Sequence, residues 1–441
     1  MKKEYKVSNI SLGCEKNLVD SEMIIGAFYE AKFTITTDLN EADIIIVNTC
    51  GFIDSAKEEA INTIFDVLDY QDNGAKIIVT GCLVQRYYDE LKKLIPEVDL
   101  WVPIRDYPRF GELLSGLLND NYSELCVKME NRLLSTPPYM AYVRISDGCN
   151  NRCHYCAIPL IRGGFVSREE EDIVEEVKKF VSAGVLEINL ISQDLNNYGY
   201  DLRTNYNKDV NLVTLLKKIV KIAGIKWVRM LYLYPDEITD ELIKLVKEEE
   251  CILPYFDIPI QHASDKMLKW MNRRGTQQDI RDLVAKIRKE IPESIIRTTL
   301  IVGFPHENEK DFNILKDFIQ EIKFDHLGAF TYSKDEDTKG YSMNMQVSKK
   351  IKNERLSEVL ELQRWISLNQ NKKHVGKSYE CIIEKYNEET NKFYGRSYAF
   401  APDDIDGAVI VDFDENIILG DINLVEVYDA DFYDLFAKLK K

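Results

Sequence analysis

Three cysteines stand close together in the segment Ser146-Asp-Gly-Cys-Asn-Asn-Arg-Cys-His-Tyr-Cys156, which gives Cys149, Cys153 and Cys156 the spacing Cys-x3-Cys-x2-Cys. Thiolates are the usual ligands of iron–sulfur clusters, and a short loop of this kind can bind three irons of a four-iron cubane. The fourth iron then lacks a protein ligand, and an open position distinguishes a reactive metal site from a structural one. A structural zinc loop is the alternative, with His154 as the nearby fourth ligand.

Cys14, Cys50 and Cys82 form a second, dispersed set, and each follows a short apolar segment typical of a strand. In open α/β sheets, ligands bind outside the carboxyl ends of parallel strands. Three cysteines at such ends can converge on one point and hold a second cluster, again with one open iron. The alternative is that each of them is a small residue of the core.

The other three of the nine cysteines, Cys126, Cys251 and Cys381, have no such neighbours, and we expect them to be structural. The N-terminal residues Met-Lys-Lys-Glu-Tyr-Lys lack the apolar region of a signal peptide. No run approaches the ~18 apolar residues of a membrane span. We therefore expect a cytoplasmic protein without membrane contact, whose cysteines bind metal or fill the core instead of forming disulfides.

Strands and helices must position these cysteines, and they alternate in residues 1–119. Strands are expected at Tyr5–Ser11, Asp43–Val47 and Lys76–Thr80, with helices between them. This pattern predicts an open, mostly parallel α/β domain. Residues 120–138 end in Ser-Thr-Pro-Pro, which cannot continue a helix, and they predict a linker.

Residues 139–373 predict a partial (β/α)6 barrel with a closing helix at 348–373, and such barrels carry their chemistry at the C-terminal ends of the strands. The six expected strands are Tyr142–Ser146, Glu187–Ile191, Val228–Tyr234, Phe256–Ile260, Ile295–Val302 and His326–Tyr332. Ser167 with Glu170 predicts a capping box at the start of one helix. Residues 374–441 show short alternating runs broken by Gly and Asp, which predicts a small antiparallel β-barrel.

The charge distribution bears on the partner. The chain has a net charge of −17, and residues 375–441 contribute −8 of it, from 7 Lys or Arg and 15 Asp or Glu. An acidic tail repels nucleic-acid phosphate and attracts a basic protein. The alternative is a solvated acidic surface that keeps the protein soluble. Five histidines scattered over 441 residues argue against a histidine-rich metal centre.

The 149–156 loop, with Tyr155 before its last cysteine, resembles the radical S-adenosylmethionine (SAM) signature. With the three upstream cysteines, and a downstream β-barrel similar to a TRAM domain, nearly the whole chain resembles the methylthiotransferases. Ser11-Leu-Gly-Cys-Glu-Lys-Asn-Leu-Val-Asp-Ser-Glu22, Asp257-Ile-Pro-Ile-Gln-His-Ala-Ser-Asp265 and Met271-Asn-Arg-Arg-Gly275 resemble the RimO family, the branch that modifies a ribosomal protein.

The resemblance implies SAM and two [4Fe–4S] clusters, with no protein acid or base as catalyst. One cluster would bind Cys149, Cys153 and Cys156, and the auxiliary cluster would bind Cys14, Cys50 and Cys82. The implied SAM contacts are Tyr155, Gln193, Gln261 and Gly303, with His262 and Arg229 as weaker candidates. Ordinary strand-end turns are the alternative explanation for these positions.

The resemblance further implies transfer of a methylthio group to the β-carbon of an aspartate in the twelfth protein of the small ribosomal subunit. The partners would be that basic protein, alone or within the ribosome, an electron donor such as flavodoxin or ferredoxin, and a sulfur donor. A tRNA adenosine methylthiotransferase of the same mechanism is one alternative. A non-catalytic metal-binding or ribosome-binding protein is another.

Overall fold

The N-terminal part of the computed structural model, which describes residues 4–206 and 208–440, is a five-stranded parallel sheet in the order β2-β1-β3-β4-β5. Its strands are β1 (Lys6–Ser11), β2 (Thr34–Ile35), β3 (Ile44–Thr49), β4 (Lys76–Gly81) and β5 (Leu100–Pro103). Its helices are α1 (Glu15–Glu30), α2 (Asp54–Leu68), α3 (Cys82–Leu94) and α4 (Phe110–Leu118). Strand β3 is buried along its whole length, as expected for the centre of a parallel sheet. The predicted parallel α/β domain is confirmed.

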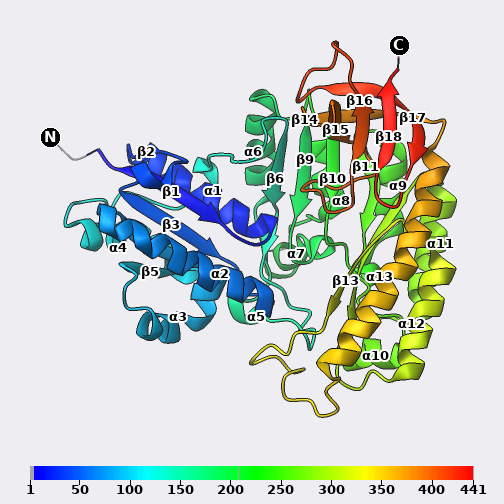
Figure 1. Cartoon of the computed structure of the whole chain (residues 1–441), viewed down its shortest axis with the longest axis horizontal. Helices are drawn as coiled ribbons and strands as arrows, with labels where there is room; N and C mark the ends of the chain where they lie inside the picture. Colours follow the sequence, from blue (N-terminus) through cyan, green and yellow to red (C-terminus); the bar gives the residue numbers. More distant parts are fainter. Residues whose placement is uncertain (1–3, 207, 441) are drawn as a thin grey trace.

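The central part is a six-stranded parallel sheet in the order β13-β12-β11-β10-β9-β6, as predicted for the partial barrel. The strand predicted at Phe256–Ile260 begins earlier, at Ile252, and shares only Phe256 and Asp257 with the prediction. Its strands are β6 (Met140–Arg144), β9 (Glu187–Ile191), β10 (Trp227–Met230), β11 (Ile252–Asp257), β12 (Ile295–Val302) and β13 (His326–Thr331). Helices between the strands pack apolar side chains against the sheet in one large core. Figure 1 shows this sheet in green beside the blue N-terminal sheet.

The larger helices of the central part are α6 (Glu170–Ser182), α8 (Leu212–Ile219), α9 (Asp240–Glu248), α11 (Gln277–Glu290), α12 (Glu309–Ile322) and α13 (Lys349–Asn371). The shorter ones are α5 (Ile158–Ile161), α7 (Tyr200–Tyr206) and α10 (Asp265–Trp270), and β7 (Ser146–Asp147) pairs with β8 (Val166–Ser167). The predicted capping box is wrong. Ser167 pairs in β8 and donates to Asp201 Oδ1 at 2.6 Å, so α6 begins after Glu169, which makes no side-chain cap.

The C-terminal part is a closed five-stranded barrel in the order β14-β15-β16-β18-β17, and the predicted small β-barrel is confirmed. Its strands are β14 (Ser378–Asn387), β15 (Lys392–Arg396), β16 (Val409–Asp412), β17 (Ile422–Ala430) and β18 (Leu435–Leu439). Four of its five pairings are antiparallel, and β16 runs parallel to β18.

This barrel closes one end of the central sheet. The loop of residues 397–407, between β15 and β16, carries Asp406, which accepts from Tyr255 Oη at 2.5 Å and from Arg297 Nε at 3.1 Å. On β15, Arg396 Nη2 binds Glu187 Oε2 at 2.7 Å, and Glu187 is the first residue of β9. The barrel therefore covers the end at which the strands begin, opposite the end that carries the chemistry (Figure 1). Among the described helices, none has the length and apolar character needed to cross a membrane.

Candidate functional site

The dispersed cysteines lie at the carboxyl ends of three neighbouring strands. Cys14 follows β1 at the start of α1, Cys50 directly follows β3, and Cys82 follows β4 as the first residue of α3. A side chain at Gly13, where φ is +89°, would come within 2.6 Å of Cys50 Cβ. Glycine at this position therefore lets the backbone next to Cys14 approach Cys50 closely.

The titration behaviour of these thiols also indicates that they lie near one another. Burial raises the pKa of Cys50, and the neighbouring Cys14 thiol raises it further. Burial raises the pKa of Cys82 to about 12, against the opposing positive charge of Arg162, and Cys14 again adds to the rise. Metal binding requires such thiols in their deprotonated form. We call Cys14, Cys50 and Cys82 the N-terminal triad.

The other three cysteines lie on the loop that follows β6 and β7, and we call them the loop triad. The loop is folded tightly, with the Cys149 N–H donating to the Gly163 carbonyl at 3.2 Å and the Cys156 N–H to the Cys153 carbonyl at 3.0 Å. Burial raises the pKa of Cys149 to about 11, with Cys153 as a further cause. Burial and then Cys153 also raise the pKa of Cys156. These three thiols therefore share one small region.

The donor atoms of the two triads bear on the choice between a cluster and a single zinc ion. Among the residues that the structure describes, no three His, Cys, Asp or Glu side chains converge closely enough to hold one metal ion. In a cubane each thiolate binds a different iron, so the sulfur atoms stand farther apart than around one zinc. His154, the fourth ligand of the zinc alternative, has Nδ1 2.8 Å from the Trp270 carbonyl oxygen. Three thiols in each triad are the donor chemistry of an iron–sulfur cluster.

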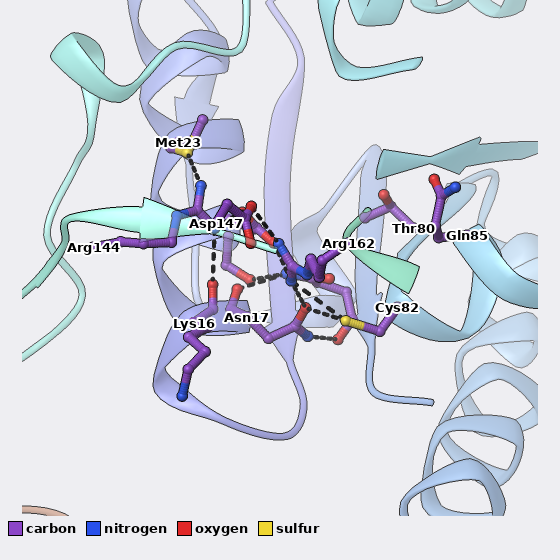
Figure 2. A network of polar contacts seen from close by, with 12 residues as sticks. Lys16, Asn17, Met23, Thr80, Cys82, Gln85, Arg144, Asp147 and Arg162 are labelled. Carbon is purple, nitrogen blue, oxygen red and sulfur yellow. Dashed lines mark hydrogen bonds and ion pairs between the residues drawn. The ribbon is translucent and has the colours of Figure 1, made fainter. Parts of the chain in front are cut away.

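The two triads meet across the boundary between the N-terminal and central sheets. Cys82 packs against Ala157 and Ile161, and Ala157 directly follows Cys156. Arg162, at the end of α5, donates through Nη2 to Cys82 Sγ at 3.3 Å. Figure 2 shows Arg162 reaching Cys82, Asn17 and Asp147, with Arg144 beside them. No cysteine spacing identifies Arg162 as a site residue, and the sequence reasoning missed it.

Two of the predicted SAM contacts border the loop triad. Tyr155 lies within the loop and packs beside the buried cluster of Met267, Met271, Phe304 and Tyr332. Gln193 follows β9 and donates from Nε2 to Asp147 Oδ1 at 3.1 Å. Its buried Oε1 has no hydrogen-bond partner among the described residues, which leaves an acceptor for a bound amine.

The other two predicted contacts lie at neighbouring strand ends. Gln261 has φ of +68°, and its backbone bridges to Leu300 of β12. Gly303 follows β12 with φ of +75°, and a side chain there would come within 2.3 Å of Lys352 Cγ. The stem of Lys352 occupies the space that a side chain at this position would need.

The weaker candidates have partners within the protein. His262 is fully buried, and its Nδ1 accepts from the N–H groups of Ala263 and Ser264, each at 2.9 Å. Arg229 binds Glu187 at 3.0 Å and the Tyr398 carbonyl at 3.0 Å, in the interface with the C-terminal barrel. Arg229 therefore holds the barrel interface, while the buried Nε2 of His262 has no hydrogen-bond partner among the described residues and lies 3.4 Å from Glu307 Oε2.

The three cysteines expected to be structural stay outside both triads. Cys381 is fully buried in β14, Cys251 packs on the core of the central part, and Cys126 is partly buried before β6.

Models of known families match each of the three parts. Residues 6–103 match Uncharacterized protein family UPF0004, residues 143–319 match the Radical SAM superfamily, and residues 375–439 match the TRAM domain. The chain is 45% identical to the ribosomal protein uS12 methylthiotransferase RimO of Acetivibrio thermocellus and 46% identical to that of Clostridium botulinum. Each comparison covers 98% of this chain and 98% of the relative.

Solved structures share the fold at low sequence identity. The radical SAM methyltransferase TsrM from Kitasatospora setae aligns with a TM-score of 0.53 and 13% identity, over 74% of this chain and 72% of that chain. The cobalamin-dependent SAM radical enzyme OxsB aligns with a TM-score of 0.51 and 11% identity, over 82% of this chain and 56% of that chain. At such identities the likeness extends to the fold alone.

Proposed function

The chain belongs to the ribosomal protein uS12 methylthiotransferase family, and from this premise we propose that it transfers a methylthio group to the β-carbon of an aspartate in ribosomal protein uS12. It is a radical SAM enzyme, and that chemistry uses SAM and a [4Fe–4S] cluster. The observation that carries the proposal is the packing of Cys82 against Ala157, the residue after Cys156. This contact brings the two triads to one boundary, as a reaction with two cluster-borne parts requires.

We assign the radical SAM cluster to the loop triad and an auxiliary [4Fe–4S] cluster to the N-terminal triad. When bound, the first cluster with SAM supplies a radical that removes hydrogen from an unactivated carbon, and the second supplies the sulfur. Three thiolates per triad leave one iron without a protein ligand in each. The chain's own part is to orient these groups and to keep water away from them.

The side chains near the loop triad suit the parts of SAM. Gln193 would offer its free Oε1 to the amino group, and the partly buried ring of Tyr155 would lie near the adenine. We keep Gln261 and Gly303 as backbone contacts at the ends of neighbouring strands. Cys50 and Cys82 are each 8% exposed and lie away from water, whereas Cys14 is exposed at the edge of the triad.

The acidic C-terminal barrel supports a protein substrate. With a net charge of −8 over residues 375–441, it would attract a basic ribosomal protein and repel the phosphates of tRNA. We therefore favour uS12, alone or in the ribosome, over the tRNA alternative. An electron donor such as flavodoxin or ferredoxin and a sulfur donor would complete the system in the cytoplasm. The proposed units are residues 1–119, a linker at 120–138, 139–373 and 374–441.

Mass spectrometry tests this function in cells that lack their own methylthiotransferases. Cells would express the chain or its Cys153→Ala variant, and both uS12 and digested tRNA would be examined. We expect a methylthio group on one uS12 aspartate with the intact chain only, and unchanged tRNA. Modified adenosine with unmodified uS12 would reject the substrate assignment, while equal modification by the Cys153→Ala variant would reject the radical SAM ligands.

A further inference from the structure

Arg162 belongs to the central part of the chain, yet its guanidinium lies against a cysteine of the N-terminal triad. It ends α5, six residues after Cys156, and its side chain is only 2% exposed. Nη2 donates to Cys82 Sγ at 3.3 Å and to Asn17 Oδ1 at 3.5 Å. The same atom lies 2.6 Å from Asp20 Oδ2, and Nη1 lies 3.4 Å from Asp147 Oδ2.

This group of charges fixes the guanidinium in place. Asp20 is 2% exposed and lies on α1, six residues after Cys14, so it holds Arg162 from the N-terminal side. Asp147 holds it from the central side, within β7. An arginine stays protonated in proteins, so its positive charge remains beside the Cys82 sulfur.

Arg144 belongs to the same group of charges but donates no hydrogen bond to a cysteine. Its Nη1 lies 2.6 Å from Asp20 Oδ1 and 3.7 Å from Asp147 Oδ2, and Nη2 lies 3.5 Å from Met23 Sδ. Both arginine side chains are buried, and both bind Asp20 and Asp147. Arg144 is therefore a matched control for the contact between Arg162 and Cys82.

We propose that Arg162 is a positioning residue through which the central part of the chain orients Cys82 and raises the reduction potential of the auxiliary cluster. This rests on the proposed assignment of that cluster to the N-terminal triad. A hydrogen bond and a positive charge at a ligand sulfur stabilise the more electron-rich state of a cluster. Since the contact crosses the boundary between the two sheets, the potential depends on how the two parts are docked.

The test uses the full-length chain with Cys149, Cys153 and Cys156 changed to Ala, so that only the auxiliary cluster is reconstituted. Iron content and the midpoint potential, from an anaerobic redox titration followed by electron paramagnetic resonance, would be measured for this parent. The same measurements follow for parents that also carry Arg162→Gln, Arg162→Lys or Arg144→Gln.

We expect Arg162→Gln to lower the ratio of reduced to oxidised cluster at a fixed potential about tenfold, which is about 59 mV for one electron. Arg162→Lys keeps the positive charge, so its midpoint potential should lie between those of the parent and the Arg162→Gln variant. It also replaces the Gln variant in the comparison if that variant loses iron. Arg144→Gln should leave the potential of the parent unchanged.

Two results would overturn the inference while leaving the cluster assignment intact. One is an unchanged potential in both Arg162 variants that hold about four irons. The other is an equal shift with Arg144→Gln, since this would assign the effect to the charge network as a whole. A parent that binds no iron would instead reject the ligand assignment, and the inference with it.

Discussion

Changing Glu187 to Gln should loosen the C-terminal barrel from the central sheet. The Glu187 carboxylate is fully buried between two guanidinium groups, 2.7 Å from Arg396 Nη2 and 3.0 Å from Arg229 Nε. The amide of the variant keeps one oxygen that can accept from Arg229 Nε, but the negative charge that balances Arg229 is lost, while Arg396 keeps Glu384 at 2.8 Å. Removing one partner of a buried ion pair costs about 3–5 kcal/mol, and we expect the docked state to weaken by that amount.

Amide hydrogen exchange followed by mass spectrometry measures this loss. Peptides covering residues 397–407 report on docking, because the Ala401 N–H donates to Asp406, which binds Tyr255 of the central sheet. A loss of about 3 kcal/mol or more would speed exchange there about a hundredfold or more. The control is Glu426→Gln in the same barrel, whose pair with Lys438 is exposed and 3.5 Å long, so little change is expected.

The pH dependence gives the same experiment a second readout. Burial acts to raise the pKa of Glu187, but Arg396 and Arg229 outweigh it and hold the pKa below its ordinary value. The carboxylate therefore contributes fully above the ordinary carboxylate pKa of about 4.3, and its contribution is lost as the pH falls through the lowered value. Exchange in the Glu187→Gln variant that matches the intact chain at neutral pH would refute this reasoning and assign docking to apolar contacts.

Three further predictions concern other parts of the chain. Burial and then Lys377 lower the pKa of His374 to about 4, so stability should fall by at most about 3 kcal/mol as the pH drops from about 6.5 to about 4; thermal unfolding of His374→Gln should show a smaller pH slope, and an equal slope would contradict this. Cys153→Ala should lower reconstituted iron from about eight to about four per chain, whereas Cys126→Ala should leave the iron content unchanged. Gly303→Ala places a methyl group 2.3 Å from Lys352 Cγ at φ of +75° and should lower the free energy of unfolding by roughly 1–3 kcal/mol in urea titrations. Adding Lys352→Ala should restore part of this stability, and no recovery would show that the Lys352 side chain is not the cause.

Strand positions followed from the sequence wherever apolar runs were long. The predicted limits of β9 and β12 agree with the structure, because β12 is apolar or β-branched at every position but Arg297 and β9 carries Ile188, Leu190 and Ile191. The strand predicted at Val228–Tyr234 ends earlier, at Met230, since Tyr232 takes a φ of +67°. Two residues of β2 and four of β5 are too few to give a periodic signal.

Only part of the candidate site could likewise be predicted from the sequence. Cysteine spacing and strand ends predicted both triads as candidates, because each cysteine lies a short distance after a strand. The charges around Arg162 could not be predicted from the sequence, since Asp20 and Cys82 lie 142 and 80 residues away from it. Contacts of that kind depend on how two separately folded sheets dock, and no local pattern records them.

The barrel that closes the central sheet also limits how this protein could be recombined. A small C-terminal barrel suggests a simple design, in which the barrel of a relative with another substrate replaces this one. Here Arg396 pairs with Glu187 of the central part. Asp406, on the 397–407 loop, accepts from Tyr255 and pairs with Arg297. A chimera that kept the catalytic sheet but received a foreign barrel would leave those groups unpaired. A change of substrate by domain exchange would therefore require the foreign barrel together with the residues of the central sheet that it contacts.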